Sequence, residues 1–384
     1  MTQRLYERDA YCREFTAQVV SCEPDGDRYR VVLDHTAFFP EGGGQAADKG
    51  TLDGNAVSDV QLLGDTVVHT VSVPLTVGST VQGAIDWPLR FSRMQSHAGE
   101  HVVSGVVHSL FGYDNVGFHM SEDELMTVDF SGPLTAEDIE TVEDKANAAV
   151  WQNVAITVSF PTPEEQKTAV YRSKLENITD LRLVTIEGVD CCACCAPHPS
   201  RTGEIGLVKI VDFIAYKGGT RITMLAGKSA FKDYAALNRA NKGLMRLLSV
   251  PREAVAEAVN RRVEAEQALR GENQQLTKRL AFCELQPITV NGSVLAITKS
   301  VGFEELRYCA NQLAEQGAKA CVLLSAVDEG YLYVAAGEPT VVKTAVTTLN
   351  TTFGGKGGGK PNYAQGKVPS QEAELLRSAL EALL

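Results

Sequence analysis

The first 88 residues alternate apolar and polar positions with a period of two, which is the pattern of half-buried β-strands. Turn dipeptides at Asp25-Gly26 and Asp53-Gly54 separate the strand-like stretches. These stretches are EFTAQVV, YRVVLD, TVVHTVSV and TVQGAI. We therefore expect a small antiparallel β-barrel or meander over residues 1–88.

A helical pattern begins at Trp87-Pro88 and runs to about Leu110, and Pro88 suits a first helical turn. Further along, ITVSF, EEQKTAVYRSKLE and LRLVTIEG predict a strand, a helix and a strand in that order. The acidic stretch over residues 121–150 predicts a solvated helical face, because its charges alternate with helix formers. Residues 89–228 should therefore form an α+β core.

Residues 229–284 are almost all helix formers, and Pro251 predicts a break just after Ser249. Beyond the break, apolar residues recur at three- and four-residue steps, which favours a helical hairpin or short coiled coil over residues 229–285. They are Val255, Val259, Leu269, Leu276, Leu280 and Cys283. Residues 286–384 predict a separate α/β unit with a glycine-rich loop before its closing helix.

The chain has 384 residues, 44% of them hydrophobic and 22% charged, so it can bury sizeable cores in two or three domains. The start carries no signal-peptide pattern, and no later run approaches about 20 uninterrupted apolar residues. We therefore expect a cytoplasmic protein with no membrane partner.

The net charge of −12 argues against nucleic-acid binding by bulk electrostatics, because phosphate binding depends on clustered lysine and arginine. Any nucleic-acid surface must then be a local patch. Nine cysteines are too sparse for a disulfide scaffold, and four of them lie within positions 191–195. Such crowding is typical of a metal site or of reactive thiols.

Two histidines, His97 and His101, stand four residues apart in the predicted helix, so their imidazoles project from one face about 6 Å apart. A second pair, Cys194 and His198, lies in CCAPHPSRTGEIG, whose prolines prevent a regular helix. Zinc prefers four nitrogen or sulfur ligands, so the two pairs together predict one zinc site. Four protein ligands ordinarily form a structural site, so catalysis requires that water or substrate joins or displaces one of them.

The same helix satisfies a competing motif. His97, Glu100 and His101 have the H-x-x-E-H spacing of a class of zinc metallopeptidases in which the glutamate is the general base. That class needs a downstream carboxylate ligand, whereas this chain offers Cys194 and His198. Glu100 is thus a candidate catalytic residue whose alternative role is that of a helix-surface residue or partner of a ligand histidine.

Consecutive glycines at Gly42, Gly43 and Gly44 fall in the segment FFPEGGGQ. Without side chains they leave backbone N–H groups unshielded, and the adjoining Gln45 can both donate and accept hydrogen bonds. The alternative is a loose hairpin turn. Beside the zinc ligands, these residues predict one wall of a substrate pocket.

A second glycine-rich segment, FGGKGGGKP, occupies residues 353–361. Its spacing matches a phosphate-binding P-loop, but Pro361 replaces the residue that would hold magnesium, which argues against nucleoside triphosphates. Residues 339–371 contain no acid and four lysines, so Lys356 and Lys360 predict a patch for a phosphate backbone, with a flexible loop as the alternative. The four are Lys343, Lys356, Lys360 and Lys367.

In this order the motifs resemble the alanyl-tRNA editing proteins, the free-standing relatives of the alanyl-tRNA synthetase editing domain that are often called AlaX. The resembling segments are FFPEGGGQ with DKG at 38–50, HAGEH at 97–101, GFHM with VDF at 117–130, and CCAPHPSRTGEIG at 194–206. In addition, FGGKGGGKPNYAQGK at 353–367 is similar to the glycine-rich signature of the DHH-associated domain. The resemblance spans nearly the whole chain.

The resemblance implies an α+β protein with four parts. They are a β-barrel over 1–88, a zinc-containing editing domain over 89–228, a helical spacer over 229–285 and a C-terminal α/β DHH-associated domain over 286–384 for tRNA binding or oligomerisation. It also implies that His97, His101, Cys194 and His198 hold zinc. The family commonly has two glycines and a threonine between the Cys and the His, whereas Cys195-Ala196-Pro197 intervene here. Cys195 is therefore the alternative to Cys194 as the cysteine ligand.

The activity implied by the resemblance is hydrolysis, in trans, of the ester that joins serine, or glycine, to the tRNA for alanine. Gln45 and Thr202 are candidates for contacting the hydroxyl of serine, because paired polar groups discriminate better than an apolar pocket. Two alternatives stay open: a non-catalytic tRNA-binding protein with a structural zinc, and a metallopeptidase of the H-x-x-E-H type. The helical seam and the C-terminal unit both offer surfaces for a homodimer.

Overall fold

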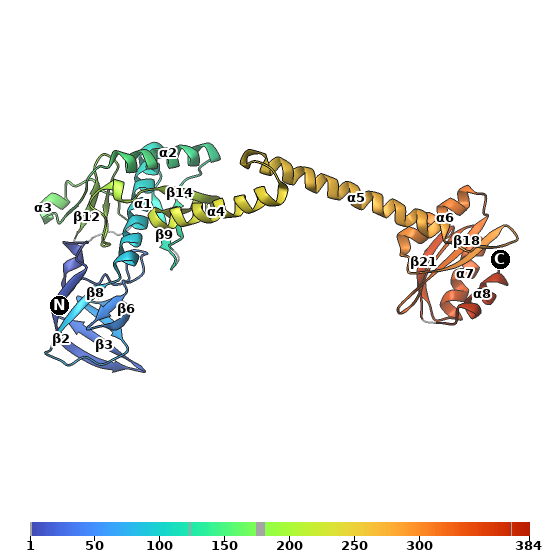
Figure 1. Cartoon of the computed structure of the whole chain (residues 1–384), viewed down its shortest axis with the longest axis horizontal. Helices are drawn as coiled ribbons and strands as arrows, with labels where there is room; N and C mark the ends of the chain where they lie inside the picture. The colour runs from blue at the N-terminus through green and yellow to red at the C-terminus, as the bar shows by residue number, and fades with distance from the viewer. Residues whose placement is uncertain (1, 123, 174–180, 370) are drawn as a thin grey trace. The chain divides into compact units, whose positions relative to one another are not determined.

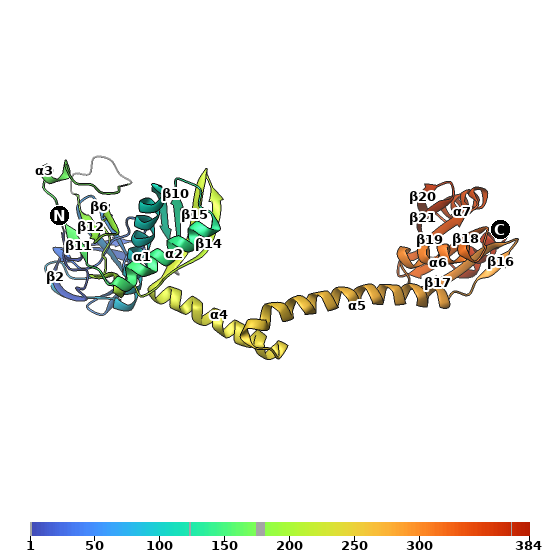
Figure 2. The ribbon, with the colours of Figure 1, turned by 90° about the horizontal axis from the view of Figure 1, so that it is seen from above.

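The computed structural model describes residues 2–122, 124–173, 181–369 and 371–384. The chain divides into two compact units, Met1–Gly243 and Leu244–Leu384, and both mix helices with sheets (Figures 1 and 2). The predicted α+β class is confirmed. The finer division at residues 88, 228 and 285 stays a prediction. Within the described residues, none of the helices has both the length and the apolar character needed to span a bilayer.

The N-terminal part of the first unit is a closed barrel of six strands. In barrel order the strands are β2 (Glu14–Asp25), β3 (Arg28–Leu33), β7 (Thr66–Val71), β6 (Asn55–Leu63), β5 (Gly50–Leu52) and β8 (Thr80–Ile85). Alternate β-branched and leucine side chains, such as Val31, Leu33 and Val60, fill its interior. A short parallel pair, β1 (Gln3–Arg4) with β4 (His35–Thr36), and the 3-10 turn η1 (Leu5–Glu7) complete this part.

Helix α1 (Trp87–Phe111) follows the barrel and is the central element of the unit. It starts where the sequence predicted, with Asp86 as its N-cap and Pro88 in its first turn, and it ends at the left-handed Gly112. Its apolar side packs in one core with α2 (Ala136–Gln152) and a four-stranded antiparallel sheet. In order, that sheet is β14 (Val208–Tyr216), β15 (Gly219–Ala226), β10 (Met126–Phe130) and β9 (Asn115–Met120).

A separate three-stranded sheet leads to the cysteine-rich loop. Its strands are β11 (Ile156–Ser159), β12 (Leu183–Ile186) and β13 (Asp190–Ala193), and the turn η2 (Thr202–Glu204) lies beyond the loop. Because β13 contacts α1, this sheet brings the cysteines to the histidine helix.

Two local predictions for the first unit were wrong. The predicted helix over 164–176 is limited to α3 (Pro163–Gln166); residues 167–173 are not helical, and 174–176 lie outside the described residues. The acidic stretch over 121–150 is helical only from Ala136, because Met126–Phe130 is the buried strand β10. In both stretches helix propensity was a weaker guide than tertiary packing.

Helices α4 (Gly227–Leu248) and α5 (Val255–Cys283) are interrupted at the predicted place, where Ser249 has a left-handed φ of 54° and η3 (Arg252–Ala254) follows. The second unit also contains a six-stranded sheet. In order it is β16 (Ile288–Val290), β17 (Ser293–Lys299), β18 (Ala320–Val327), β19 (Gly330–Gly337), β21 (Tyr363–Val368) and β20 (Lys356–Lys360). Its helices are α6 (Phe303–Glu315), α7 (Pro339–Thr351) and α8 (Ala373–Glu381).

The glycine-rich segment of this unit was predicted to be a loop, and that was wrong, because it forms the edge strand β20. An added Cβ at Gly357 would lie 2.2 Å from the Tyr333 hydroxyl, and one at Gly359 would lie 2.2 Å from the Tyr363 carbonyl. These glycines therefore serve close strand packing.

Candidate metal centre

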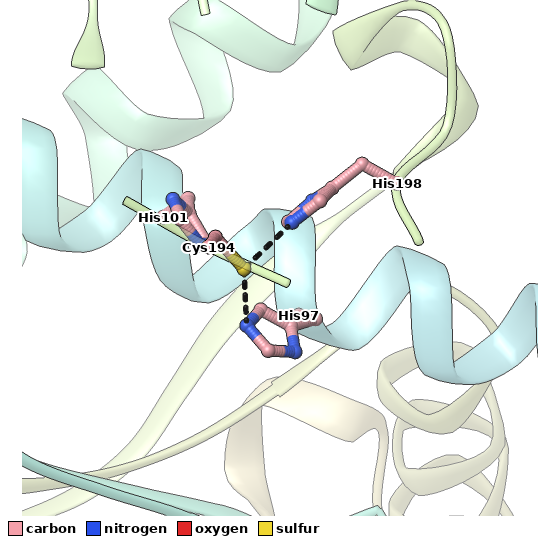
Figure 3. A group of neighbouring side chains, drawn as sticks. All are labelled: His97, His101, Cys194 and His198. Carbon is pink, nitrogen blue, oxygen red and sulfur yellow. Dashed lines mark hydrogen bonds between the residues drawn. The ribbon is translucent and has the colours of Figure 1, made fainter. Parts of the chain in front are cut away.

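The structure brings His97, His101, Cys194 and His198 together in the first unit. Their ligand atoms all lie within 4.8 Å of one another, and the three histidines are buried. The Cys194 Sγ lies 3.3 Å from His198 Nε2 and 3.6 Å from His97 Nε2, as Figure 3 shows. This group could hold a metal ion. It includes Cys194 and does not include the alternative, Cys195.

The histidine pair is positioned by α1. The rings of His97 and His101 stack one turn apart, with centroids 5.3 Å apart, and the His198 ring meets the His101 ring edge-on at 4.7 Å. Gly105 of α1 lets the helix pack closely against residues 189–190, since an added Cβ at Gly105 would lie 2.5 Å from the Val189 carbonyl and 2.8 Å from Asp190. The helix therefore approaches β13 closely where the cysteine-rich loop begins.

Two side chains orient the histidines from behind. The Nδ1 of His97 lies 3.0 Å from Gln45 Oε1, and the Nδ1 of His101 lies 3.2 Å from Asp190 Oδ2. Each imidazole can thus donate from Nδ1 and leave Nε2 as the free nitrogen that faces the cluster. The third, His198, has no partner at Nδ1 within the described residues.

Asp190 is itself held by Arg172, whose Nε and Nη2 each donate to one of its carboxylate oxygens at 2.7 Å. The Asp190 side chain is 2% exposed, so this pair is largely shielded from water. Sequence reasoning missed both residues. Nothing local marks Arg172, whereas the position of Asp190 directly before the cysteine-rich stretch could have indicated it; both act on a helix residue that precedes them by more than 70 positions.

The loop carrying Cys194 and His198 is fixed by Arg182, another residue that sequence reasoning missed. Its Nη1 donates to the Cys194 carbonyl at 2.7 Å and to the Ala196 carbonyl at 2.9 Å. Its Nε donates to the Glu7 carbonyl at 3.4 Å. Behind the loop, Ala196 is buried with Tyr6 and Phe39, so an apolar cluster and a guanidinium hold the loop from two sides.

The electrostatic environment favours a thiolate at the centre. Burial by itself would raise the pKa of the Cys194 thiol, but His97 and His198 lower this pKa well below its usual value. Burial lowers the pKa of His198 to about 3, which favours its neutral form, so this ring stabilises the thiolate through the hydrogen bond between them. Burial opposes a charge on His101 as well, yet the hydrogen bond with Asp190 raises the pKa of His101 well above its usual value. The carboxylate therefore favours positive charge at that ring.

The glycine-rich segment of the barrel forms a tight turn beside the cluster. Gly42 and Gln45 exchange backbone hydrogen bonds at 3.1 and 3.0 Å, and Gly43 and Gly44 have left-handed φ values of 59° and 81°. An added Cβ at Gly44 would lie 2.9 Å from the Phe118 carbonyl. Added Cβ atoms at Gly42 and Gly43 would lie 3.8 and 3.5 Å from the Cys195 thiol, so the turn lies against the cysteine-rich loop.

A buried pair of opposite charges joins this turn to α1. The guanidinium of Arg90, 0% exposed, donates from Nε to Asp48 at 2.9 Å and from Nη2 to the Ala37 carbonyl at 2.6 Å. Asp48 in turn accepts from the Phe39 backbone N–H at 2.6 Å. This network ties both ends of FFPEGGGQ to the helix that carries His97.

Of the predicted site residues, Gln45 lies at the cluster and its Nε2, although buried, has no hydrogen-bond partner among the described residues. Glu100 and Thr202 are not brought into the cluster. The Glu100 carboxylate accepts hydrogen bonds from Ser104 and Asn115, and the Thr202 hydroxyl donates to the Ala149 carbonyl at 2.9 Å and accepts from Val154 N. Lys356 and Lys360 are exposed on β20, in the other unit.

Three families match parts of the chain. Residues 11–89 match the family described as tRNA synthetases class II (A). Residues 181–247 match the threonyl and alanyl tRNA synthetase second additional domain, and residues 291–384 match the DHHA1 domain. Together with the His and Cys cluster, these matches define a protein built from the domains of class II tRNA synthetases.

Similarity over the full length narrows this class. The chain is 30% identical over 403 residues to the alanyl-tRNA editing protein Aarsd1 of Rattus norvegicus, covering 99% of this chain and 97% of that protein. It is 26% identical over 401 residues to the alanyl-tRNA editing protein AlaX-L of Pyrococcus horikoshii, covering 100% and 98%. An alanine–tRNA ligase of Ignicoccus hospitalis is 30% identical over 385 residues, which are 97% of this chain and 42% of the ligase. The chain belongs to the family of alanyl-tRNA editing proteins.

Proposed function

We propose that this protein is a trans-editing hydrolase that removes serine, or glycine, from mischarged tRNA for alanine, with a zinc ion held by His97, His101, Cys194 and His198. The observation that carries this proposal is the four-residue cluster, in a chain similar over its full length to two alanyl-tRNA editing proteins.

The donor set and its spacing fit zinc. In a tetrahedral zinc site, nitrogen and sulfur ligands lie about 3.6 Å apart, as follows from zinc–nitrogen and zinc–sulfur bonds of about 2.1 and 2.3 Å. The distances from Cys194 Sγ to His198 and His97 are 3.3 and 3.6 Å. The lowered pKa of Cys194 and the hydrogen bonds at two Nδ1 atoms further suit a thiolate and imidazole ligands. Bound zinc would supply Lewis acidity and lower the pKa of water at the ester.

The chain's own residues would orient the substrate. The buried Gln45 Nε2 is an unused donor beside the cluster, and a hydroxyl of the aminoacyl group could accept its hydrogen bond. The Thr202 hydroxyl already has a donor and an acceptor, so Gln45 is the better of the two candidates for selecting serine. Gly43 and Gly44 would form the wall that lets the substrate approach the backbone.

The contacts of Glu100 favour this function over a metallopeptidase. In the peptidase the glutamate must reach a water at the metal. Here the Glu100 carboxylate accepts hydrogen bonds from Ser104 and Asn115, and the residue is 4% exposed. The remaining alternative is a tRNA-binding protein in which zinc is only structural.

The test is deacylation of a panel of seryl-, glycyl- and alanyl-tRNA for alanine, with and without a chelator. We expect zinc-dependent release of serine, little release of alanine, and loss of activity in His97→Ala and Cys194→Ala. His108→Ala is the matched control, because this exposed histidine of α1 pairs with Asp114 and lies outside the cluster. Unchanged hydrolysis by folded, metal-free protein would disprove a catalytic zinc. Binding of these tRNAs without hydrolysis of any of them would support the non-catalytic alternative.

A further inference from the structure

Helix α4 carries a continuous stripe of positive charge. Its members follow one another at steps of four, seven, three and four residues, so they lie within about 40° of one line along the helix. The stripe is about 27 Å long at 1.5 Å of rise per residue. It consists of Lys228, Lys232, Arg239, Lys242 and Arg246.

None of these charges is neutralised by the protein. All five side chains are exposed, and in the described parts of the chain none makes a side-chain hydrogen bond or an ion pair. The one acid of α4, Asp233, lies on the other side of the helix by its position in the sequence. In a chain of net charge −12, five unpaired cations on one line mark a local surface for an anionic partner.

The start of this stripe is packed against α1, the helix that carries His97 and His101. The Lys228 backbone N–H donates to Gln95 Oε1 at 3.2 Å, and Gln95 Nε2 donates to the Glu204 carbonyl at 2.8 Å. Gln95 stands on α1 two residues before His97, about 200° round the helix, so it joins α4 to the face of α1 opposite the metal ligands. The helix starts at Gly227, whose φ is 58° and where an added Cβ would lie 2.6 Å from the Gln95 side chain. The first charges of α4 and the metal centre therefore belong to one packed body.

We propose that the α4 stripe binds the phosphate backbone of the acceptor arm of the tRNA whose aminoacylated end occupies the metal centre. This inference rests on the proposed function. A double-stranded RNA arm is a rigid polyanion, recognised through its phosphates and sugars. Within the first unit, the row from Lys228 to Lys242 is about 21 Å long, and a row of this length suits such a partner better than a single nucleotide.

Exposed apolar side chains of α4 give the helix an amphipathic character: Phe231 borders the stripe, and Tyr234 and Leu237 lie on other sides. A basic amphipathic helix can also bind an anionic lipid surface. RNA is favoured because the stripe begins in the same unit as a site whose substrate would be an RNA, and a bilayer offers nothing for that site. Binding to lipid is therefore an outcome for the experiment to separate.

The test compares the full chain with the triple variant Lys232→Gln, Arg239→Gln, Lys242→Gln. Binding of deacylated tRNA for alanine is measured at several salt concentrations, with kcat and KM for seryl-tRNA alongside. We expect the slope of log affinity against log salt to become shallower by about 2 to 3, because each phosphate contact contributes nearly one. KM should rise at least about tenfold at physiological salt, while kcat at saturation stays unchanged.

The matched control removes three exposed cations from other elements, Lys49→Gln, Lys145→Gln and Lys167→Gln, and so changes net charge equally. An unchanged salt slope in the α4 variant, or an equal loss in both triple variants, would overturn the proposal. So would α4-dependent binding to vesicles of phosphatidylserine and phosphatidylcholine without α4-dependent binding to tRNA.

Failure of the proposed function gives a different result. If no tRNA of the panel is deacylated but the salt slope still depends on α4, the stripe is supported and the hydrolase is not. If seryl-tRNA is deacylated normally and the slope is unchanged, the stripe alone is refuted. Tryptophan fluorescence from Trp87 and Trp151, the only two tryptophans, checks that the variants keep the first unit folded.

Discussion

Replacing Asp190 by Asn should weaken metal binding as well as destabilise the fold. The substitution keeps the shape of the side chain but removes the charge that His101 Nδ1 meets at 3.2 Å and that Arg172 meets twice at 2.7 Å. It also allows the side chain to present an N–H toward His101, which would favour the wrong tautomer or ring orientation.

The expected magnitude follows from these contacts. Loss of a hydrogen-bonding partner behind a ligand histidine typically costs 10- to 100-fold in metal affinity, on the order of 1.4–2.7 kcal/mol. Removing one partner of a buried ion pair also destabilises the fold by about 3 kcal/mol or more, because the other charge stays buried. Arg172 is 14% exposed, so water can take up part of that second cost.

The assay is competition for Zn²⁺ against a chromophoric chelator, with the absorption spectrum of the Co²⁺-loaded protein reporting ligand geometry. The matched control is Asp129→Asn. Asp129 also accepts two hydrogen bonds from one guanidinium, that of Arg221 at 2.6 and 2.8 Å, and lies outside the cluster. Equal zinc affinity for Asp190→Asn and the wild type would refute the positioning role. An equal loss in both variants would attribute the effect to general destabilisation.

Three further predictions concern the turn, the barrel and the edge strand. Gly44→Ala should destabilise the first unit by about 1–3 kcal/mol, because a residue with a left-handed φ of 81° would have to hold a Cβ 2.9 Å from the Phe118 carbonyl. Urea unfolding followed by tryptophan fluorescence measures this loss, and Gly54→Ala is the control, because Gly54 has a similar φ but open space around its Cβ. Burial lowers the pKa of His69 to about 4, so the unfolded state binds the additional proton as pH falls below about 6.5. The first unit should accordingly lose about 2 kcal/mol of stability between pH 7.5 and 5 through this group, and a pH dependence that is identical in His69→Gln would contradict the assignment. Lys356→Gln with Lys360→Gln should weaken binding of tRNA for alanine without lowering kcat, and unaltered affinity at low salt would remove β20 from the RNA-binding surface.

Local sequence patterns predicted the elements that depend on local rules. The start of α1 at Asp86 and Pro88, the break at Ser249, and the facing of His97 and His101 all follow from capping, proline chemistry and the helical repeat. The strand pattern of the N-terminal part likewise follows from the period of two. Each of these signals lies within a few residues of its effect.

The features that escaped prediction depend on residues distant in sequence. Arg172 and Arg182 have ordinary sequence neighbours. An isolated bridge to Cys192 brings Arg172 to the cluster, and the pairing of β12 with β13 brings Arg182 and Asp190 together. The glycines of β20 predicted a flexible loop, but in the structure they form a strand that Tyr333 and Tyr363 approach closely. The spacing of the α4 cations can be read from the sequence, but only the structure shows that their side chains are exposed and have no partners among the described residues.

Arg182 joins the loop of Cys194 to the carbonyl of Glu7, and the segment that contains Glu7 is synthesised long before Arg182 and the loop. The N-terminal turn must therefore wait for about 175 further residues before its partner exists. Metal acquisition thus becomes one of the last steps in the maturation of this unit. A nascent chain halted before residue 194 would hold only the helical pair of ligands. A tag that displaces residues 5–7 should impair metal loading in a finished protein whose four ligands are all intact.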